Sequence, residues 1–245
     1  RYVSIKNDTE IIGDMYFYEN DAAHITISEN TDLTIQGNVN ADVYTTILDE
    51  SGMTIKSGAN VKVLGDFIVK STSKCTFVMG LSGTLVVNGD LTATTALEIN
   101  QNEGSYLKLC GNFTRGKAVG SFNAGVLEVQ GDSDARISGG SKYTVILSGS
   151  QLQNISNLTA PTIIINNSKG VKFNSAIKPT TLFNHNGNPF TLYNNGSGSS
   201  FADFDYDGLK DNVDPEPTVG NPCTITVATE DTKKGSVSES LDTNG

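Results

Sequence analysis

The six residues Leu85–Asp90 read Leu-Val-Val-Asn-Gly-Asp, and this arrangement, apolar-x-apolar-x-Gly followed by Asn or Asp, recurs along the chain. Two apolar residues with one residue between them place both side chains on the same face of a short β-strand. Glycine supplies a positive φ, and a short polar side chain after it suits the same turn. Each copy therefore predicts a strand that ends at a tight corner. The other copies are Leu33–Asn38, Val61–Asp66, Leu107–Asn112 and Leu127–Asp132, with a weaker copy at Val145–Gly149.

Successive glycines of this repeat are 28, 24, 22, 20 and 18 residues apart. One strand per repeat cannot bury its apolar face alone, whereas stacked coils bury a continuous stripe. The repeat therefore predicts an all-β fold, a right-handed parallel β-helix (a β-solenoid) with coils about 4.8 Å apart, tapering toward its C-terminal end. We expect one interior ladder formed by Ile35, Val63, Val87, Leu109, Val129 and Leu147.

Secondary alternations between these copies, such as Ile25–Ile27, Met53–Ile55 and Leu97–Ile99, are expected to form the other sides of each coil. A β-sandwich with hairpin turns is the alternative fold. It would place strands about 8–12 residues apart, joined by two-residue turns, and the repeat fits that spacing less well.

The composition of the 245 residues excludes several classes of protein. Charged residues make up 18%, Trp is absent and Gly is abundant, as in chains with many short strands and turns. A net charge of −10 with three arginines makes nucleic acid an improbable partner. No apolar run approaches the roughly 18 residues that a membrane helix needs, so we expect no membrane insertion.

Three cysteines, Cys75, Cys110 and Cys223, give an odd count without a CxxC pair. This spacing is neither a disulfide framework nor a zinc site. Cys75 and Cys110 could pair if neighbouring coils align them, or both could be buried thiols, and the sequence leaves the two alternatives open.

An aspartate-rich loop follows the repeat region, and it reads Asp-Phe-Asp-Tyr-Asp-Gly-Leu-Lys-Asp-Asn-Val-Asp over residues 203–214. Ca²⁺ prefers six to eight oxygen ligands, and carboxylates at alternate positions wrap around one centre. Gly208 would make the sharp turn, and without a cation the carboxylates would repel one another. The loop has the spacing of an EF-hand loop, but no amphipathic helices flank it. We predict one Ca²⁺ bound by Asp203, Asp205, Asp207, the Leu209 carbonyl and Asp214, with Asp211 acting through water.

The loop resembles a thrombospondin type 3 repeat, whose unit D-x-D-x-D-G-x-x-D-x-x-D it matches at all five aspartates. The resemblance implies the same ligand set and a structural ion. It departs from that pattern because no cysteine follows the final Asp and because one unit is present. Calcium would therefore rigidify the junction that ends in Asp214-Pro-Glu-Pro217.

Catalytic residues are not evident in the sequence. Glu98 and Glu128 occupy outward positions between apolar residues, where a solvated strand face is expected. His24 and His185 have no nucleophile or acid near them in a triad pattern, and His185 reads as a turn residue. The chain is therefore expected not to be an enzyme. Exposed aromatic residues would favour glycan binding, and the candidates are Tyr16, Phe17, Tyr18 and Tyr106.

The amino-acid sequence of the repeats at 124–131 and 143–149 resembles that of the β-solenoid regions of large secreted bacterial surface proteins, which have the pectin-lyase-like fold. The resemblance implies an extracellular structural or adhesive scaffold segment, with neighbouring domains, copies of itself or surface glycans as partners. A carbohydrate-binding module or a polysaccharide-degrading β-helix enzyme is the alternative, because the fold alone does not determine an activity.

Three parts of the chain are expected: a solenoid domain over 1–200, the calcium-binding linker over 201–217, and the start of a small β-repeat domain over 218–245. The first residues do not read as a signal peptide, and the last ones stop in mid-pattern. We therefore expect the parent protein to be longer.

Overall fold

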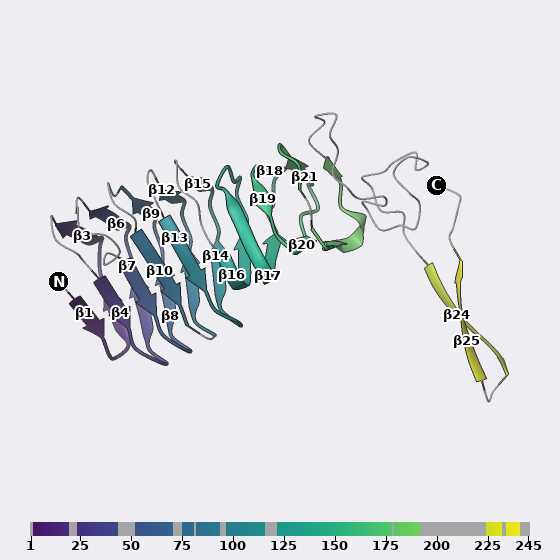
Figure 1. Ribbon diagram of the computed structural model, residues 1–245, viewed down its shortest axis with the longest axis horizontal. Helices are drawn as coiled ribbons and strands as arrows, with labels where there is room; N and C mark the ends of the chain where they lie inside the picture. Colours follow the sequence, from purple (N-terminus) through teal and green to yellow (C-terminus); the bar gives the residue numbers. More distant parts are fainter. Residues whose placement is uncertain are drawn as a thin grey trace.

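The chain is an all-β protein whose main body is a parallel β-solenoid (Figure 1). The structure, a computed structural model, describes residues 2–19, 24–43, 52–70, 75–80, 82–93, 97–115, 122–177, 179–191, 224–231 and 234–240. Every strand pairing between residues 2 and 191 is parallel, as in a coil that returns to the same side once per turn. The solenoid prediction is confirmed, and the hairpin sandwich is excluded.

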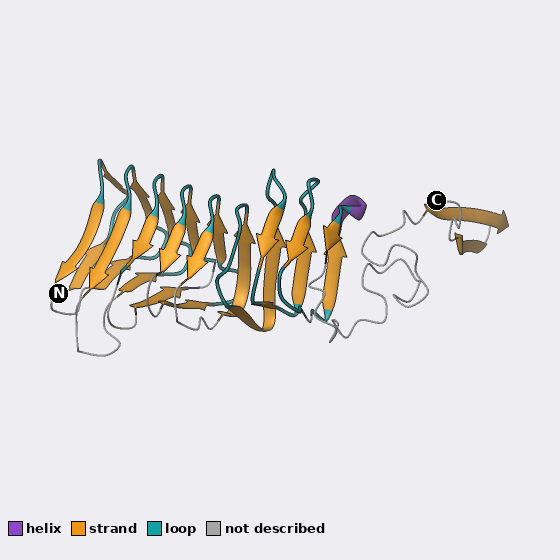
Figure 2. Ribbon diagram, turned by 90° about the horizontal axis from the view of Figure 1, so that it is seen from above, coloured by secondary structure: helices purple, strands orange, loops and turns teal. Residues whose placement is uncertain are grey.

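The first five coils each contribute one strand to three sheets, which form the three sides of the stack (Figure 2). Sheet A contains β1 (Tyr2–Ile5), β4 (His24–Ile27), β7 (Gly52–Ile55), β10 (Cys75–Met79) and β13 (Leu97–Gln101). Sheet B begins with β2 (Thr9–Ile11), β5 (Asp32–Ile35), β8 (Asn60–Val63), β11 (Thr84–Val87) and β14 (Tyr106–Leu109). Sheet C contains β3 (Met15–Glu19), β6 (Val39–Val43), β9 (Phe67–Val69), β12 (Leu91–Ala93) and β15 (Phe113–Arg115).

Sheet A ends at β13, and the later coils are built differently. Sheet B continues through β16 (Phe122–Val129), β17 (Ile137–Leu147), β20 (Thr162–Ile165) and β22 (Thr181–Asn184), and β19 (Leu158–Thr159) pairs with β17. A three-stranded sheet of β18 (Gln153–Ile155), β21 (Val171–Phe173) and β23 (Phe190–Thr191) lies on the side of sheet C. Single bridges from Phe113 to Ser133 and from Ser133 to Ile155 connect it to β15. A short 3₁₀ turn, His185–Gly187, follows β22.

The taper that the repeat predicts is present, with exceptions at both ends. Paired residues of sheet B are 28 positions apart between β5 and β8, and 18 apart between β16 and β17. The first coil breaks the trend, because its paired residues Thr9 and Leu33 are 24 positions apart. In the last coil, the paired residues Ile163 and Leu182 are 19 positions apart. Among the three-sheet coils, four residues always join β4, β7, β10 and β13 to the next strand of sheet B, and three always join sheet B to sheet C. The connection from sheet C to sheet A varies between three and eight residues, so it sets the coil length there.

Further shortening comes from the loss of the corner between sheets A and B. β16 runs unbroken across the position of that corner, and within it Gly125 has a φ of 94°. A side chain is rarely tolerated at such a φ. The later coils therefore need fewer residues per turn.

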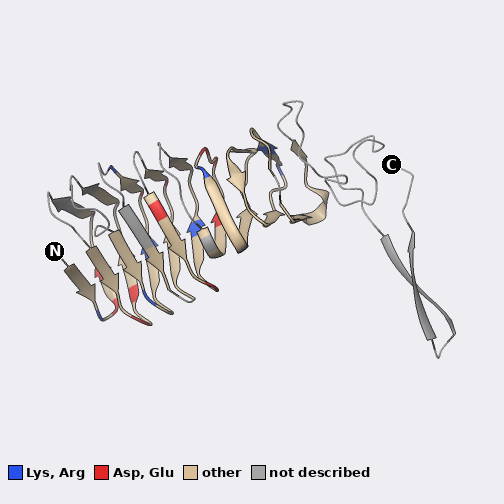
Figure 3. Cartoon of the chain, in the orientation of Figure 1, with Lys and Arg blue, Asp and Glu red and all other residues tan. Residues whose placement is uncertain are grey.

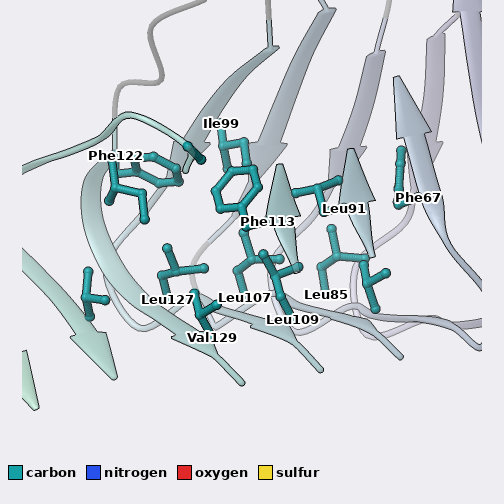
Figure 4. Packing of buried hydrophobic residues seen from close by; sticks show 14 of the residues in the cluster. Phe67, Leu85, Leu91, Ile99, Leu107, Leu109, Phe113, Phe122, Leu127 and Val129 are labelled. Carbon is teal, nitrogen blue, oxygen red and sulfur yellow. The ribbon is translucent and has the colours of Figure 1, made fainter. Parts of the chain in front are cut away.

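The interior ladder has the predicted composition. Val63, Val87 and Leu109 lie directly beside one another in register and are each 0% exposed. Phe67 and Phe113, from sheet C, face this sheet from the opposite side of the interior (Figure 4). The secondary alternations form sheet A as expected, with Ile25 beside Met53. Burial of this continuous apolar stripe is the main stabilising contribution to the stack.

The glycine of the repeat has a different role from the predicted one. Gly37, Gly65, Gly89, Gly111 and Gly131 do not have a positive φ, so the expected backbone reason is wrong for them. A Cβ at these positions would instead collide with the preceding coil. At Gly89 it would meet the Asp66 carboxylate and the Gly65 backbone, the latter at 2.8 Å. Glycine is needed because two coils approach closely at this corner.

The C-terminal part of the described chain is an antiparallel hairpin of β24 (Thr224–Asp231) and β25 (Lys234–Ser240). β24 covers the stretch Thr224–Val227, whose alternation predicts a strand. Within the described ranges, no helix has the length and apolar character to cross a bilayer.

Candidate functional site

The predicted calcium ligands lie outside the described residues. These predicted ligands are Asp203, Asp205, Asp207, Leu209, Asp211 and Asp214. In the part of the chain that the structure describes, no group of three or more His, Cys, Asp or Glu side chains could hold a metal ion. The calcium site stays a prediction from the sequence.

Asp or Asn residues at equivalent places in successive coils form a ladder of hydrogen bonds, which we call the corner ladder. The members from Asn38 to Asp132 follow a repeat glycine, whereas Asn154 follows Gln153. An Asp or Asn side-chain oxygen of one coil accepts the backbone N–H of the equivalent residue in the next coil, at 2.7–2.9 Å. Backbone bonds between successive repeat glycines run parallel to it, as from Gly89 N–H to the Gly65 carbonyl at 3.0 Å. The members are Asp14, Asn38, Asp66, Asp90, Asn112, Asp132 and Asn154.

This ladder explains why the repeat alternates between Asp and Asn without preference. Either side chain presents an oxygen acceptor, and the donor is always a backbone amide. The sequence pattern indicates a polar corner residue, but it does not reveal that the oxygen reaches the coil ahead. The sequence signal for this ladder is the recurrence of a short side chain with an oxygen acceptor at successive corners.

A cluster of polar side chains lies on the outward face of sheet B at the boundary between the two kinds of coil. Strand register brings Lys108 of β14 beside Glu128 of β16. The Glu128 Oε1 accepts from Ser148 Oγ at 2.7 Å and lies 3.1 Å from the Lys108 Nζ. The Tyr106 hydroxyl donates to Glu128 Oε2, and Gln130 Nε2 lies 3.4 Å from Oε1.

The expected solvated position of Glu128 is wrong, because this residue is 9% exposed. Burial raises its pKa, but hydrogen bonds from Tyr106, Ser148 and Lys108, with the charge of Lys108, lower the pKa below its ordinary value overall. Burial and the hydrogen bond to Glu128 raise the pKa of the Tyr106 phenol far above its ordinary value. Glu128 is therefore a charged carboxylate held by groups from three adjacent strands.

The hydrogen bonds of this cluster indicate a structural role for Glu128. Both carboxylate oxygens of Glu128 already accept hydrogen bonds, and Tyr106 is a poor proton donor because the pKa of its phenol is raised. Glu103 lies elsewhere, with a side chain that is 70% exposed and an ion pair to Lys142 at 3.1 Å. Figure 3 shows that acidic and basic residues are both scattered along the described coils.

The other candidates are distributed over separate sides of the solenoid. His24 Nε2 lies 2.9 Å from Thr54 Oγ1 on the outward face of sheet A, and its ring is 6.1 Å from that of Tyr2. His185 lies in the 3₁₀ turn, as its sequence context predicts. Cys110 is a free thiol at the end of a sheet B strand, whereas Cys75 begins a strand of sheet A.

The aromatic candidates for glycan binding do not form a row among the described side chains. Tyr16 is 65% exposed and its hydroxyl donates to Asp14 Oδ2 at 3.0 Å, while Tyr106 is half-buried in the Glu128 cluster. The side chains of Phe17 and Tyr18 lie outside the described set.

Comparison with known proteins gives no relative. No family model matches the chain, and neither a curated protein nor a solved structure matches it significantly.

Proposed function

We propose that this chain is a scaffold segment of an extracellular, multidomain bacterial surface protein, in which the solenoid holds neighbouring domains at a fixed separation. The observation that supports this role most directly is the unbroken corner ladder from Asp14 to Asn154. It ties each coil to the next with the same bond, beside a continuous apolar interior. Such a stack resists bending because every coil contacts its neighbours over the whole cross-section.

A spacer is tested by measuring whether its two ends stay at one distance. Spin labels at Asn7 and Lys169, both exposed, should give a single narrow distance distribution by pulsed electron resonance. The distance should increase by about 4.8 Å when one further coil is inserted between them. A broad distribution, or no increase on insertion, would contradict the spacer role.

An adhesive role is the second form of this proposal, and it needs a ligand. The exposed Tyr2 and Tyr16 of the first coil are the described aromatics best placed to contact a sugar. A glycan array with the purified chain separates the two forms. Selective binding that Tyr16→Ala removes would identify an adhesin, and its absence would favour the pure spacer.

We further propose that one Ca²⁺ rigidifies the chain after the solenoid. The support is the aspartate spacing of residues 203–214, whose carboxylates match the oxygen preference of this ion. Calorimetry should detect one binding event that Asp205→Ala abolishes and that Asn212→Ala, within the same loop, preserves. Chelation should increase proteolysis near Pro215 and leave the β signal of circular dichroism unchanged. Equal calorimetric traces for the two variants would refute the site.

A further inference from the structure

An exposed turn between the last two strands of the solenoid contains an Asn-Gly pair. The turn is the 3₁₀ segment His185–Gly187, drawn in purple in Figure 2, and it lies between β22 and β23. None of its residues is buried, and Asn186 and Gly187 have φ values of 59° and 60°. A single 3₁₀ turn has poor hydrogen-bond geometry, so this exposed segment opens more readily than the strands on either side.

An Asn-Gly pair is more labile chemically than other pairs that begin with Asn. The backbone nitrogen of the glycine attacks the Asn Cγ, because glycine has no Cβ that obstructs the approach. The N–Cγ bond forms and the Cγ–Nδ2 bond breaks, and Nδ2 leaves as ammonia with the proton of the glycine amide. Water then opens either carbonyl of the cyclic succinimide and gives aspartate or isoaspartate. Water is the only co-reactant.

The described residues contain a second Asn-Gly pair, Asn88–Gly89, at the close corner of two coils. The Asn88 amide donates to the Val63 carbonyl at 2.9 Å, and the Gly89 amide donates to the Gly65 carbonyl at 3.0 Å. The attack requires a rotation that brings the glycine nitrogen to the Asn Cγ, and here that rotation would separate two stacked coils. The fold therefore protects this pair and leaves the pair in the turn accessible.

The turn is flanked by buried residues of the last coil. Leu182 of β22 is 5% exposed and Phe190 of β23 is 2% exposed. Across the turn, Asn184 Nδ2 donates to the Asn188 carbonyl at 2.8 Å. Isoaspartate carries the main chain through the former side chain, which adds a methylene group to the backbone. A longer backbone between Asn184 and Asn188 would weaken the pairing of β22 with β20 and of β23 with β21.

We propose that Asn186 is a site of spontaneous deamidation, through a succinimide formed with the Gly187 nitrogen, and that the isoaspartate product loosens the last coil. The product accumulates with the age of the molecule, because hydrolysis of the succinimide and loss of ammonia are not reversed in water. This goes beyond the scaffold role, because it assigns a chemical modification to one turn whatever the solenoid is used for.

Peptide mass mapping of the purified full chain, aged at neutral pH, tests the choice of site. Isoaspartate, identified by enzymatic methylation of its carboxylate, should appear at Asn186 at least about tenfold faster than at Asn88. In urea the two positions should react at similar rates, because the fold protects Asn88. The Asn-Gly pairs at 195–196 and 244–245 lie outside the described residues, and mapping separates them from Asn186. Equal rates at Asn186 and Asn88 in the folded chain would overturn the proposal.

Amide hydrogen exchange tests the effect on the last coil, after the intact and isoaspartate forms of the aged chain are separated by chromatography. Exchange in β22 and β23 should be about tenfold faster in the isoaspartate form, whereas β11 and β12, which flank Asn88, should be unchanged. Freshly prepared Asn186→Asp has the added charge without the longer backbone and should keep its protection. Asn186→Gln, whose side chain cyclises more slowly, should stay unmodified on ageing. Unchanged exchange in the isoaspartate form, or an equal loss of protection in Asn186→Asp, would overturn the assigned effect of the longer backbone.

Discussion

The coils of residues 2–115 and those of residues 122–191 share the corner ladder but differ in what fills their interior. Before Gln101, every buried residue among those described is apolar except Thr31. From Gln101 onward, polar side chains enter the interior, including Ser105, Gln153 and Asn167. The change coincides with the end of sheet A at β13.

These polar residues bond backbone groups where the regular pairing between coils changes. Gln101 Nε2 donates to the Val126 carbonyl at 3.0 Å, and its Oε1 accepts from the buried Tyr143 hydroxyl at 2.8 Å. Gln153 donates to the carbonyls of Val129 and Gly131 and accepts from the Gly149 amide. Amide side chains thus satisfy buried backbone groups in the coils where the regular pairing changes.

The largest expected effect comes from breaking the apolar interior of the three-sheet coils. Val87→Asp places a carboxylate without a partner in the fully buried ladder, which should cost about 3–5 kcal/mol. Urea unfolding followed by circular dichroism measures the loss. Val86→Asp, one residue away on the outward face, is the control and should cost much less; similar losses would show that the two faces are not distinct.

Replacing a buried polar side chain with an apolar one should lower the stability of the later coils. Gln153→Leu removes the donor to the Gly131 carbonyl and the acceptor of the Gly149 amide, and leaving these two groups unpaired should cost about 3 kcal/mol. The Val129 carbonyl keeps the Ser148 amide as a donor. Gln151→Leu, whose side chain is exposed, is the control. If Gln153→Leu were neutral, the later interior would tolerate an apolar core as the earlier one does, and the contrast between the regions would fail.

A side chain added at a repeat glycine should destabilise the stack in either region. Gly89→Ala brings a Cβ against the Asp66 carboxylate and the Gly65 backbone, and the required shift should cost about 2 kcal/mol. Asn88→Ala, at the exposed neighbouring position, should cost little. Thermal unfolding of both variants measures the difference, and a stable Gly89→Ala protein would mean that the coils can separate at this corner.

The smallest effect is expected at the boundary cluster and depends on pH. Glu128→Gln removes the charge that Lys108 and Tyr106 stabilise, at a cost of about 1 kcal/mol near neutral pH. Because the folded pKa of Glu128 is lowered, its contribution is present above the unfolded value of about 4.3 and is lost as the pH falls through the folded pKa.

The measurement is the difference in unfolding free energy between the wild-type protein and Glu128→Gln from acidic to neutral pH. The difference should shrink toward zero in acid. Glu103→Gln removes an exposed ion pair and should show a much smaller difference at every pH. A difference for Glu128→Gln that does not change with pH would contradict the assigned charge state.

The sequence alone predicts the stack and its interior because the repeat places apolar residues such as Val63 and Val87 at equivalent positions in every coil. The spacing of these positions also predicts the coil lengths between β5 and β17. By contrast, glycine is required at position 89 because two coils approach closely there. The sequence of one repeat does not reveal that distance. Gln101 and Gln153 lie outside the repeat. Gln101 continues the alternation of Leu97 and Ile99, but a polar side chain at that position does not by itself indicate burial.

The candidate site was less predictable than the fold. Glu128 follows the outward alternation, so its position on the strand was evident, but its burial depends on Tyr106 and Ser148 from the strands on either side. These contacts arise from register between coils that are 20 and 18 residues apart. The proposed calcium loop could be inferred from the sequence because all its candidate ligands lie within one short segment.

The variable connection from sheet C to sheet A has a consequence for protein engineering. Its length differs between three and eight residues from coil to coil, while the strands on both sides keep their register. An epitope or enzyme-recognition peptide grafted there would interrupt neither the interior rows nor the corner ladder. Because the strands that flank this connection are stacked in register, the attachment points of grafts in successive coils would lie about 4.8 Å apart.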